Sequence, residues 1–207
     1  MREQQKTALQ QKLKQKLKQK LNRRALGGFF AAFAVLAARL PPVWAAPKGE
    51  MAPKNAPAPA NASAVDAPFL VNGKTMNLQS FKGQPIMLWQ VATWCKSCAA
   101  GLKTMAENLA LIHASNLKVI ILRDYQNGGY PGEEMGKFVA ANAPELLHDP
   151  HFIIGEDTEE LFQRYNPHHY VDVYHLIGSD GRIAVISSAP SATFDKIAQF
   201  IKAEGKS

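Results

Sequence analysis

Two short apolar runs dominate the middle of the chain, at residues 85–91 (PIMLWQV) and 117–122 (LKVIIL). Near-continuous apolar runs of this length are typical of strands that lie inside a sheet and are covered on both faces. Between them, apolar residues recur every three or four positions, which predicts a helix over residues 98–114. The alternation of strand and helix indicates an α/β domain.

The flanking segments complete this predicted domain. Short apolar stretches on either side of Asn72-Gly73 predict a tight hairpin, because this dipeptide favours the required turn. Downstream, the patterns predict helices over 132–141, 157–165 and 191–203, with Asp157 as an N-cap, and strands over 152–154, 171–177 and 182–187. The predicted fold is a central mixed β-sheet flanked by helices, with an N-terminal β-hairpin extension.

The first 45 residues differ from the rest and have the pattern of an export signal. They contain ten of the 24 basic residues and one of the 17 acidic residues, followed by an apolar run at 25–38 and a small-residue site ending at Ala45. The run is shorter than the roughly 20 residues of a membrane span. We expect cleavage after Ala45, with retention as a membrane anchor as the alternative, and at least transient membrane contact. The pair Arg23-Arg24 leaves the general and the twin-arginine export routes open.

Residues 46–65 are rich in Pro and Ala and contain few large apolar residues, which is typical of a linker. The folded domain is therefore predicted to span residues 66–207. Because the basic residues are concentrated in residues 1–45, the remainder carries a slight excess of acid. This distribution removes the main argument for a nucleic-acid partner.

The two cysteines of the chain, Cys95 and Cys98, lie between the first predicted inner strand and the helix that follows it. A thiolate at a helix N-terminus is favoured by the helix dipole and by free backbone N–H groups, and Lys96 adds a neighbouring cation. Cys95 is therefore the expected nucleophile, and Cys98, one turn along, is placed to attack a mixed disulfide. A structural disulfide would close too small a loop to constrain much chain entropy. Metal binding and an inert disulfide are the alternatives.

The motif Trp94-Cys95-Lys96-Ser97-Cys98, between a strand and a helix, resembles that of the thioredoxin superfamily. Residues 66–83 and 175–183 resemble the N-terminal hairpin and the penultimate strand of its exported TlpA/ResA-like branch. The resemblance covers residues 66–203.

This resemblance implies an exported thiol–disulfide oxidoreductase that needs no cofactor. It would reduce or exchange disulfides in other exported cysteine-containing proteins, including those of cytochrome c biogenesis, and would receive electrons from a membrane thiol-reducing partner. The implied location is the periplasm, or the outer face of the inner membrane, of a bacterium.

The sequence departs from this family at two positions. The family carries a cis-proline before the penultimate strand, facing the cysteines, where this chain has Asp172 or Val173. Many members also bury an acid six residues before the first cysteine, where this chain has Trp89, so another residue or water has to take the proton. The expected site contains two catalytic cysteines and five neighbours: Cys95, Cys98, Trp94, Lys96, Ser97, Asp172 and Val173. Trp94 is expected to pack beside the cysteine pair.

Two other function classes remain open at this point. The segment near His168 and His169 also resembles that of Sco copper chaperones, and two thiolates with an imidazole suit Cu(I). The alternative function is thus a copper carrier that uses Cys95, Cys98 and His168 or His169. A scaffolding domain with little turnover is the third class.

Overall fold

The computed structural model describes residues 62–205, and the structural statements below refer to them. The predicted export signal and most of the predicted linker lie outside the described residues. Within residues 62–205, no helix has the length and apolar character to cross a membrane.

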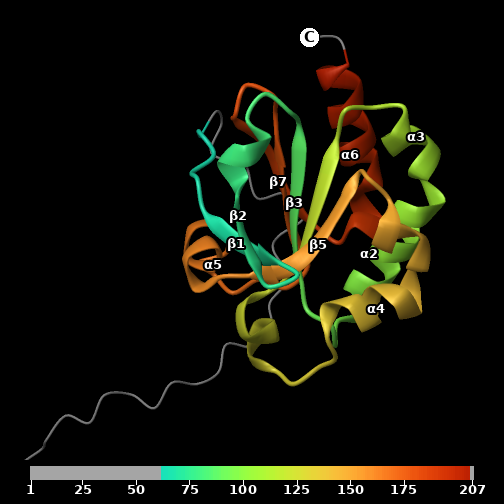
Figure 1. Cartoon of the computed structure of the whole chain (residues 1–207). Coiled ribbons are helices and arrows are strands. Elements are labelled where there is room, and N and C mark those ends of the chain that lie inside the picture. The colour runs from blue at the N-terminus through green and yellow to red at the C-terminus, as the bar shows by residue number, and fades with distance from the viewer. Residues whose placement is uncertain (1–61, 206–207) are drawn as a thin grey trace, which may run out of the picture. The chain divides into compact units, whose positions relative to one another are not determined.

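A seven-stranded mixed sheet forms the centre of the domain, in the order β2-β1-β5-β4-β3-β6-β7 (Figure 1). Its strands are β1 (Pro68–Val71), β2 (Lys74–Asn77), β3 (Ile86–Val91), β4 (Lys118–Arg123), β5 (Phe152–Asp157), β6 (Val173–Ile177) and β7 (Ile183–Ser188). Strands β3, β4 and β5 are parallel, whereas β6 is antiparallel to β3 and β1 is antiparallel to β5. The predicted mixed sheet with an N-terminal hairpin is confirmed.

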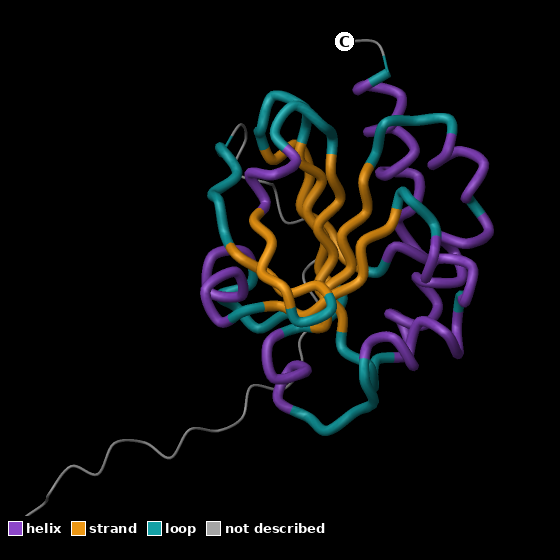
Figure 2. Tube along the Cα trace, viewed as in Figure 1, coloured by secondary structure: helices purple, strands orange, loops and turns teal. Residues whose placement is uncertain are grey.

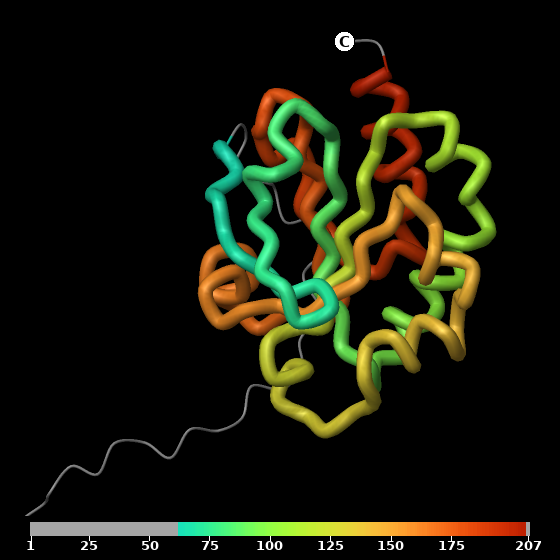
Figure 3. Tube along the Cα trace, viewed as in Figure 1, coloured from blue at the N-terminus to red at the C-terminus, as the bar shows by residue number. Residues whose placement is uncertain are grey.

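Helices cover both faces of this sheet (Figures 1 and 2). The α-helices are α2 (Lys96–Glu107), α3 (Leu109–His113), α4 (Met135–Asn142), α5 (Glu159–Tyr165) and α6 (Pro190–Glu204), and the short 3₁₀ helices are η1 (Leu78–Phe81), η2 (Tyr125–Gly129) and η3 (Pro144–His148). Helix α5 lies on one face, and α2, α3, α4 and α6 lie on the other (Figure 1). Figure 3 follows the chain from the hairpin to the C-terminal helix across this sheet.

Three predicted helix boundaries were wrong. The helix expected over 98–114 begins at Lys96 and is interrupted at Asn108, so it forms α2 and α3. Helix α4 begins at Met135 instead of 132. Asp157 is not an N-cap: it ends β5 because its backbone pairs with Phe69 of β1. The N-cap of α5 is Thr158, whose hydroxyl accepts a hydrogen bond from the Leu161 N–H at 3.2 Å.

Strand β3 is buried along its whole length, as its apolar run predicts. Met87, Trp89 and Val91 pack into the core formed with α2, α4 and α6, and Ile86 and Leu88 pack into the core beneath α5. Burial on both faces fixes the strand between two layers. The loop that leaves β3 therefore starts from a rigid position.

The antiparallel pairing of β3 and β6 determines which chain segments meet at the cysteines. Gln90, near the end of β3, pairs with Val173 at the start of β6. The residues that follow β3 and the residue that precedes β6 consequently lie at the same edge of the sheet. Cys95 and Asp172 come from these two segments.

Gly155 of β5 lies directly against β1 of the N-terminal hairpin, so a substitution there tests how the hairpin packs on the sheet. A Cβ atom at Gly155 would collide with the Leu70 backbone carbonyl of β1, which cannot move aside as a flexible side chain can. Gly155→Ala is expected to lower the free energy of unfolding by about 1–3 kcal/mol, in the range of overpacked cores. Urea unfolding followed by circular dichroism measures this.

The matched control is Gly136→Ala in α4, where a Cβ has open space. It is expected to be neutral or to stabilise by about 0.5–1 kcal/mol, because Ala favours a helix more than Gly does. Equal stability of the two variants would contradict the steric argument.

Candidate active site

Cys95 occupies the N-cap of helix α2, the position expected for the nucleophile. Its backbone is extended (φ −87°, ψ 118°), and the helix begins at Lys96. The Cys95 Sγ accepts a hydrogen bond from the Cys98 backbone N–H at 3.3 Å and lies 3.1 Å from the Ser97 hydroxyl. Hydrogen bonds to sulfur and the positive end of the helix dipole both favour the thiolate.

The two thiols have opposite acidities. Hydrogen bonding from Cys98, with a smaller contribution from Ser97, lowers the pKa of Cys95 to about 7 against the effect of burial. Burial, together with its interaction with Cys95, raises the pKa of Cys98 well above its usual range. Cys95 is 8% exposed and Cys98 is fully buried. The Cys95 thiol thus keeps a small exposed fraction and is acidic, whereas the Cys98 thiol is inaccessible and protonated at neutral pH.

Asp172 lies beside this pair. Its side chain is fully buried, and a carboxylate oxygen lies within 4.8 Å of the Sγ atoms of Cys95 and Cys98. The Oδ1 atom accepts a hydrogen bond from the Trp89 indole Nε1 at 2.8 Å. Burial raises the pKa of the Asp172 carboxyl, although interactions with Ser97, Trp89 and Cys98 oppose the shift. The structure thus places an acid at the site although β3 itself supplies none.

The loop after β4 supports Trp94, which precedes the nucleophile. The Trp94 Nε1 donates to the Asn127 carbonyl oxygen at 2.7 Å, and its ring meets Tyr130 edge-on with centroids 5.1 Å apart. Asn127 also accepts a hydrogen bond from the Thr93 N–H at 2.9 Å. Trp94 is 39% exposed, so its ring lies at the surface against this loop.

Asn127 is the site residue that sequence reasoning missed. It lies in the 3₁₀ segment η2 (residues 125–129), which has left-handed backbone at three consecutive positions. The dipeptide Asn127-Gly128 was an available signal, because Asn and Gly tolerate this conformation best.

The other predicted neighbours are distributed around the pair. Lys96 is exposed, and Val173 is buried at the start of β6. His168 and His169 are exposed. The His168 ring lies beside the Tyr170 ring, with centroids 5.5 Å apart, and the His169 ring lies beside the Phe162 ring, with centroids 4.7 Å apart. Within residues 62–205, the cluster of atoms able to hold a metal consists of Cys95, Cys98 and Asp172 and contains neither histidine.

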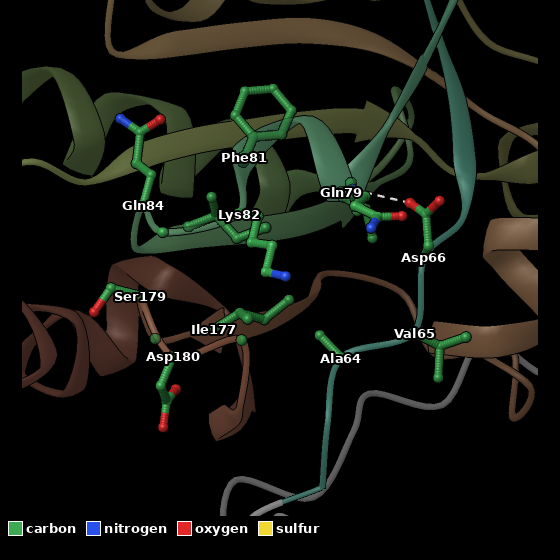
Figure 4. Close-up of a pocket in the computed structure, with 15 residues that line it drawn as sticks. Ala64, Val65, Asp66, Gln79, Phe81, Lys82, Gln84, Ile177, Ser179 and Asp180 are labelled. Carbon is green, nitrogen blue, oxygen red and sulfur yellow. Dashed lines mark hydrogen bonds between the residues drawn. The ribbon is translucent and has the colours of Figure 1, made fainter.

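A pocket lies at the other end of the sheet (Figure 4). Its walls come from the start of β3, the end of β6 and the segment around η1, and include Phe81, Lys82 and Ile177. The Asp66 carboxylate at its edge accepts a hydrogen bond from the Gln79 N–H at 2.9 Å. Because Ile86 and Ile177 pair at the end of β3 opposite to the cysteines, this pocket is separate from the thiol site.

Comparison with known proteins places the fold. The sequence matches no protein-family model and no curated protein. A protein proposed to be the thiol:disulfide interchange protein DsbE of Chlorobium tepidum is 19% identical, with a TM-score of 0.55 over 70% of this chain and 96% of that one. A proposed protein disulfide isomerase of Bacteroides thetaiotaomicron is 20% identical, with a TM-score of 0.55 over 72% of this chain and 91% of that one.

BsSco, a member of the Sco family of cytochrome c oxidase assembly proteins, is 16% identical, with a TM-score of 0.53 over 72% of this chain and 96% of that one. These similarities confirm the thioredoxin-like fold. The described domain is thus a thioredoxin-like domain with its paired cysteines at the start of α2.

Two further carboxylates are buried near the other face of the sheet. The Asp157 Oδ2 accepts a hydrogen bond from the Gln90 Nε2 at 2.6 Å. Burial raises the pKa of Asp157 to about 7, and burial together with the nearby Asp157 raises the pKa of Asp124 to about 8. Both acids therefore hold a proton in the folded chain at pH values where an unfolded chain would release it.

This difference predicts how stability varies with pH. Because the pKa of Asp157 is raised in the folded chain, its contribution to the free energy of unfolding is fully present below about pH 4. This contribution is lost as pH rises to about 7. Relative to wild type, Asp157→Asn should gain stability between these pH values, by up to about 1.4 kcal/mol per pH unit. Urea unfolding at several pH values measures this difference. A pH-independent difference would show that Asp157 does not titrate in this way.

Proposed function

We propose that this chain is a thiol–disulfide oxidoreductase whose Cys95–Cys98 pair cycles between dithiol and disulfide. The observation that supports it most strongly is the division between the two thiols: Cys95 at a helix N-cap with its pKa lowered to about 7, and Cys98 fully buried with its pKa raised. A nucleophile with a pKa near ambient pH is best suited to attack a disulfide.

The reaction follows from this geometry in two steps. The Cys95 thiolate attacks one sulfur of a substrate disulfide, a new bond joins the two sulfurs, and the other substrate sulfur leaves as a thiolate. Cys98 then attacks the Cys95 Sγ, which lies within 4.8 Å, and the remaining substrate sulfur leaves. The substrate gains two electrons, and the Cys95–Cys98 pair becomes a disulfide.

The surroundings of this reaction are also part of the proposal. The predicted signal in residues 1–45 and the DsbE-like fold support an exported, TlpA-like protein of the periplasm or of the outer face of the inner membrane. Its substrates are disulfides of other exported proteins, and a membrane thiol-reducing partner restores the dithiol. The reaction requires no cofactor, since the electrons reside on the two sulfurs.

Copper carriage is less well supported by the described residues. It needs an imidazole beside the two thiolates, whereas His168 and His169 are exposed and lie outside the donor cluster. The third donor in that cluster is a carboxylate of Asp172, which is a harder ligand than Cu(I) prefers. We therefore favour the oxidoreductase over the carrier.

A redox titration of the full-length chain tests the proposal. In dithiothreitol buffers of defined potential, alkylation and mass spectrometry count the free thiols. We expect one reversible two-electron transition, none in Cys95→Ser, and a stable mixed disulfide with an added disulfide peptide in Cys98→Ser. Thiols that remain masked until a chelator is added would instead indicate a metal carrier and contradict the proposal.

The acidity of Cys95 has its own test. Because the thiolate is the reactive form, the rate of alkylation by iodoacetamide should rise with pH and reach half of its plateau near pH 7. In Cys98→Ala the hydrogen bond from the second thiol is lost, so the midpoint should move to higher pH. The same midpoint in both proteins would show that Cys98 does not set the acidity of Cys95.

A further inference from the structure

The second step of this reaction requires a proton acceptor. Cys98 is fully buried, and burial holds its pKa well above the usual range, so it is protonated at neutral pH. A thiol must lose its proton to attack a disulfide. Solvent has little access to this sulfur, so an acceptor inside the protein would accelerate the step.

Asp172 has a free acceptor atom at this place. Its Oδ1 accepts the Trp89 indole N–H, whereas its Oδ2 has no partner in hydrogen-bond geometry among the described residues. The side chains of Ser97 and Cys98 are near enough to lower the pKa of this carboxyl, so Cys98 is within reach of the carboxylate. The side chain is completely buried, so the free oxygen is shielded from water. An unpaired buried carboxylate oxygen is costly unless a nearby group shares a proton with it. Cys98 lies within 4.8 Å.

Packing around Trp89 holds this carboxylate in place. A Cβ at Gly101 of α2 would lie 2.6 Å from the Trp89 Cη2 atom, so the indole rests directly against the helix that carries both cysteines. The backbone of Asp172 is held as well, because its carbonyl accepts a hydrogen bond from the Ala189 N–H at 3.0 Å. The acid and the thiols are thus linked through rigid neighbours.

We propose that Asp172 accepts the proton of Cys98 when that thiol attacks the mixed disulfide. The assignment rests on the proposed function. The proton passes from the Cys98 Sγ to the Asp172 carboxylate, and the Cys98 electron pair forms the bond to the Cys95 Sγ. The bond between Cys95 and the substrate sulfur breaks, and its electron pair leaves on that sulfur. The proton remains on Asp172 at the end of this step.

The groups that influence this transfer come from several elements. On α2, Cys95 and Cys98 both have their pKa raised by the Asp172 carboxylate, among smaller contributions. On β6, Tyr174 also interacts with Asp172, and Asp195 of α6 interacts with Tyr174. Removing the Asp172 charge should therefore make Cys95 a better nucleophile while it deprives Cys98 of its acceptor. The two steps should respond in opposite directions.

Asp172→Asn tests the assignment with little risk to the fold. The backbone at Asp172 is left-handed (φ 65°), a conformation that Asn tolerates well. The Asn side-chain oxygen can still accept the Trp89 N–H. The control is Asp157→Asn, which removes another buried carboxylate that lies outside the cluster with the thiols.

The probe is the chromogenic disulfide dithiobis(nitrobenzoic acid), mixed in stopped flow with the reduced full-length chain. The first thionitrobenzoate released reports attack by Cys95, and the second reports attack by Cys98. In Asp172→Asn we expect the first step at pH 7 to be unchanged or faster and the second to be slower by about a hundredfold, the usual scale of general-base catalysis. Acid quenching should show the mixed disulfide accumulating.

The pH profile separates proton transfer from a structural defect. Without the Asp172 carboxylate, the second step depends on hydroxide. The difference in its rate between Asp172→Asn and wild type should therefore narrow as pH rises, whereas Asp157→Asn should have the wild-type rate at every pH. If Asp172→Asn carries out the second step at the wild-type rate, or is slowed equally at every pH, the assignment of Asp172 is overturned and the proposed function still stands. A wild-type chain that releases no thionitrobenzoate would overturn the proposed function and this assignment together.

Discussion

The antiparallel pairing of β3 with β6 is the constraint on which the thiol site depends. It brings the segment after β3, which carries both cysteines, to the segment before β6, which carries Asp172. Some 75 residues separate these segments along the chain, and without that pairing neither would form a site. Burial of β3 on both faces fixes this meeting point, because a shift of one residue would move Trp89 from one core to the other.

Much of this fold was predictable because local patterns determine it. The apolar runs of β3 and β4 identify inner strands, and the helical spacing after Cys98 identifies the helix that bears the thiols. Boundaries were less predictable where tertiary contacts override local preference. Asp157 is a residue type that often caps helices, yet its backbone pairs with β1 in the sheet. Thr158 is therefore the N-cap of α5.

The site was predictable in part for a similar reason. The spacing of Cys95 and Cys98 indicates paired thiols, and counting along a thioredoxin-like fold placed Asp172 nearby. The sequence does not show that Asp172 is fully buried, or that one of its oxygens is held by an indole while the other is free. These features depend on how β3, α2 and the segment before β6 pack together, and the local sequence does not determine that packing. The role of Asn127 depends in the same way on contacts between two loops.

Trp89 and Asp172 form a complementary pair between β3 and the segment before β6. The indole N–H of Trp89 donates to the Asp172 carboxylate at 2.8 Å, so the two side chains fit each other in space. The carboxylate approaches the thiols from the segment before β6, and the thiol site thereby contains a buried acid.

The left-handed backbone at Asp172 also restricts how this site could change in evolution. Proline holds φ near −65°, whereas this residue has φ 65°, so a proline at position 172 would require the turn before β6 to be rebuilt. Most other side chains are strained in this conformation, and the short polar ones are the exceptions. Asp, Asn and Gly tolerate this backbone best, and among these three only Asp supplies an acid beside the thiols.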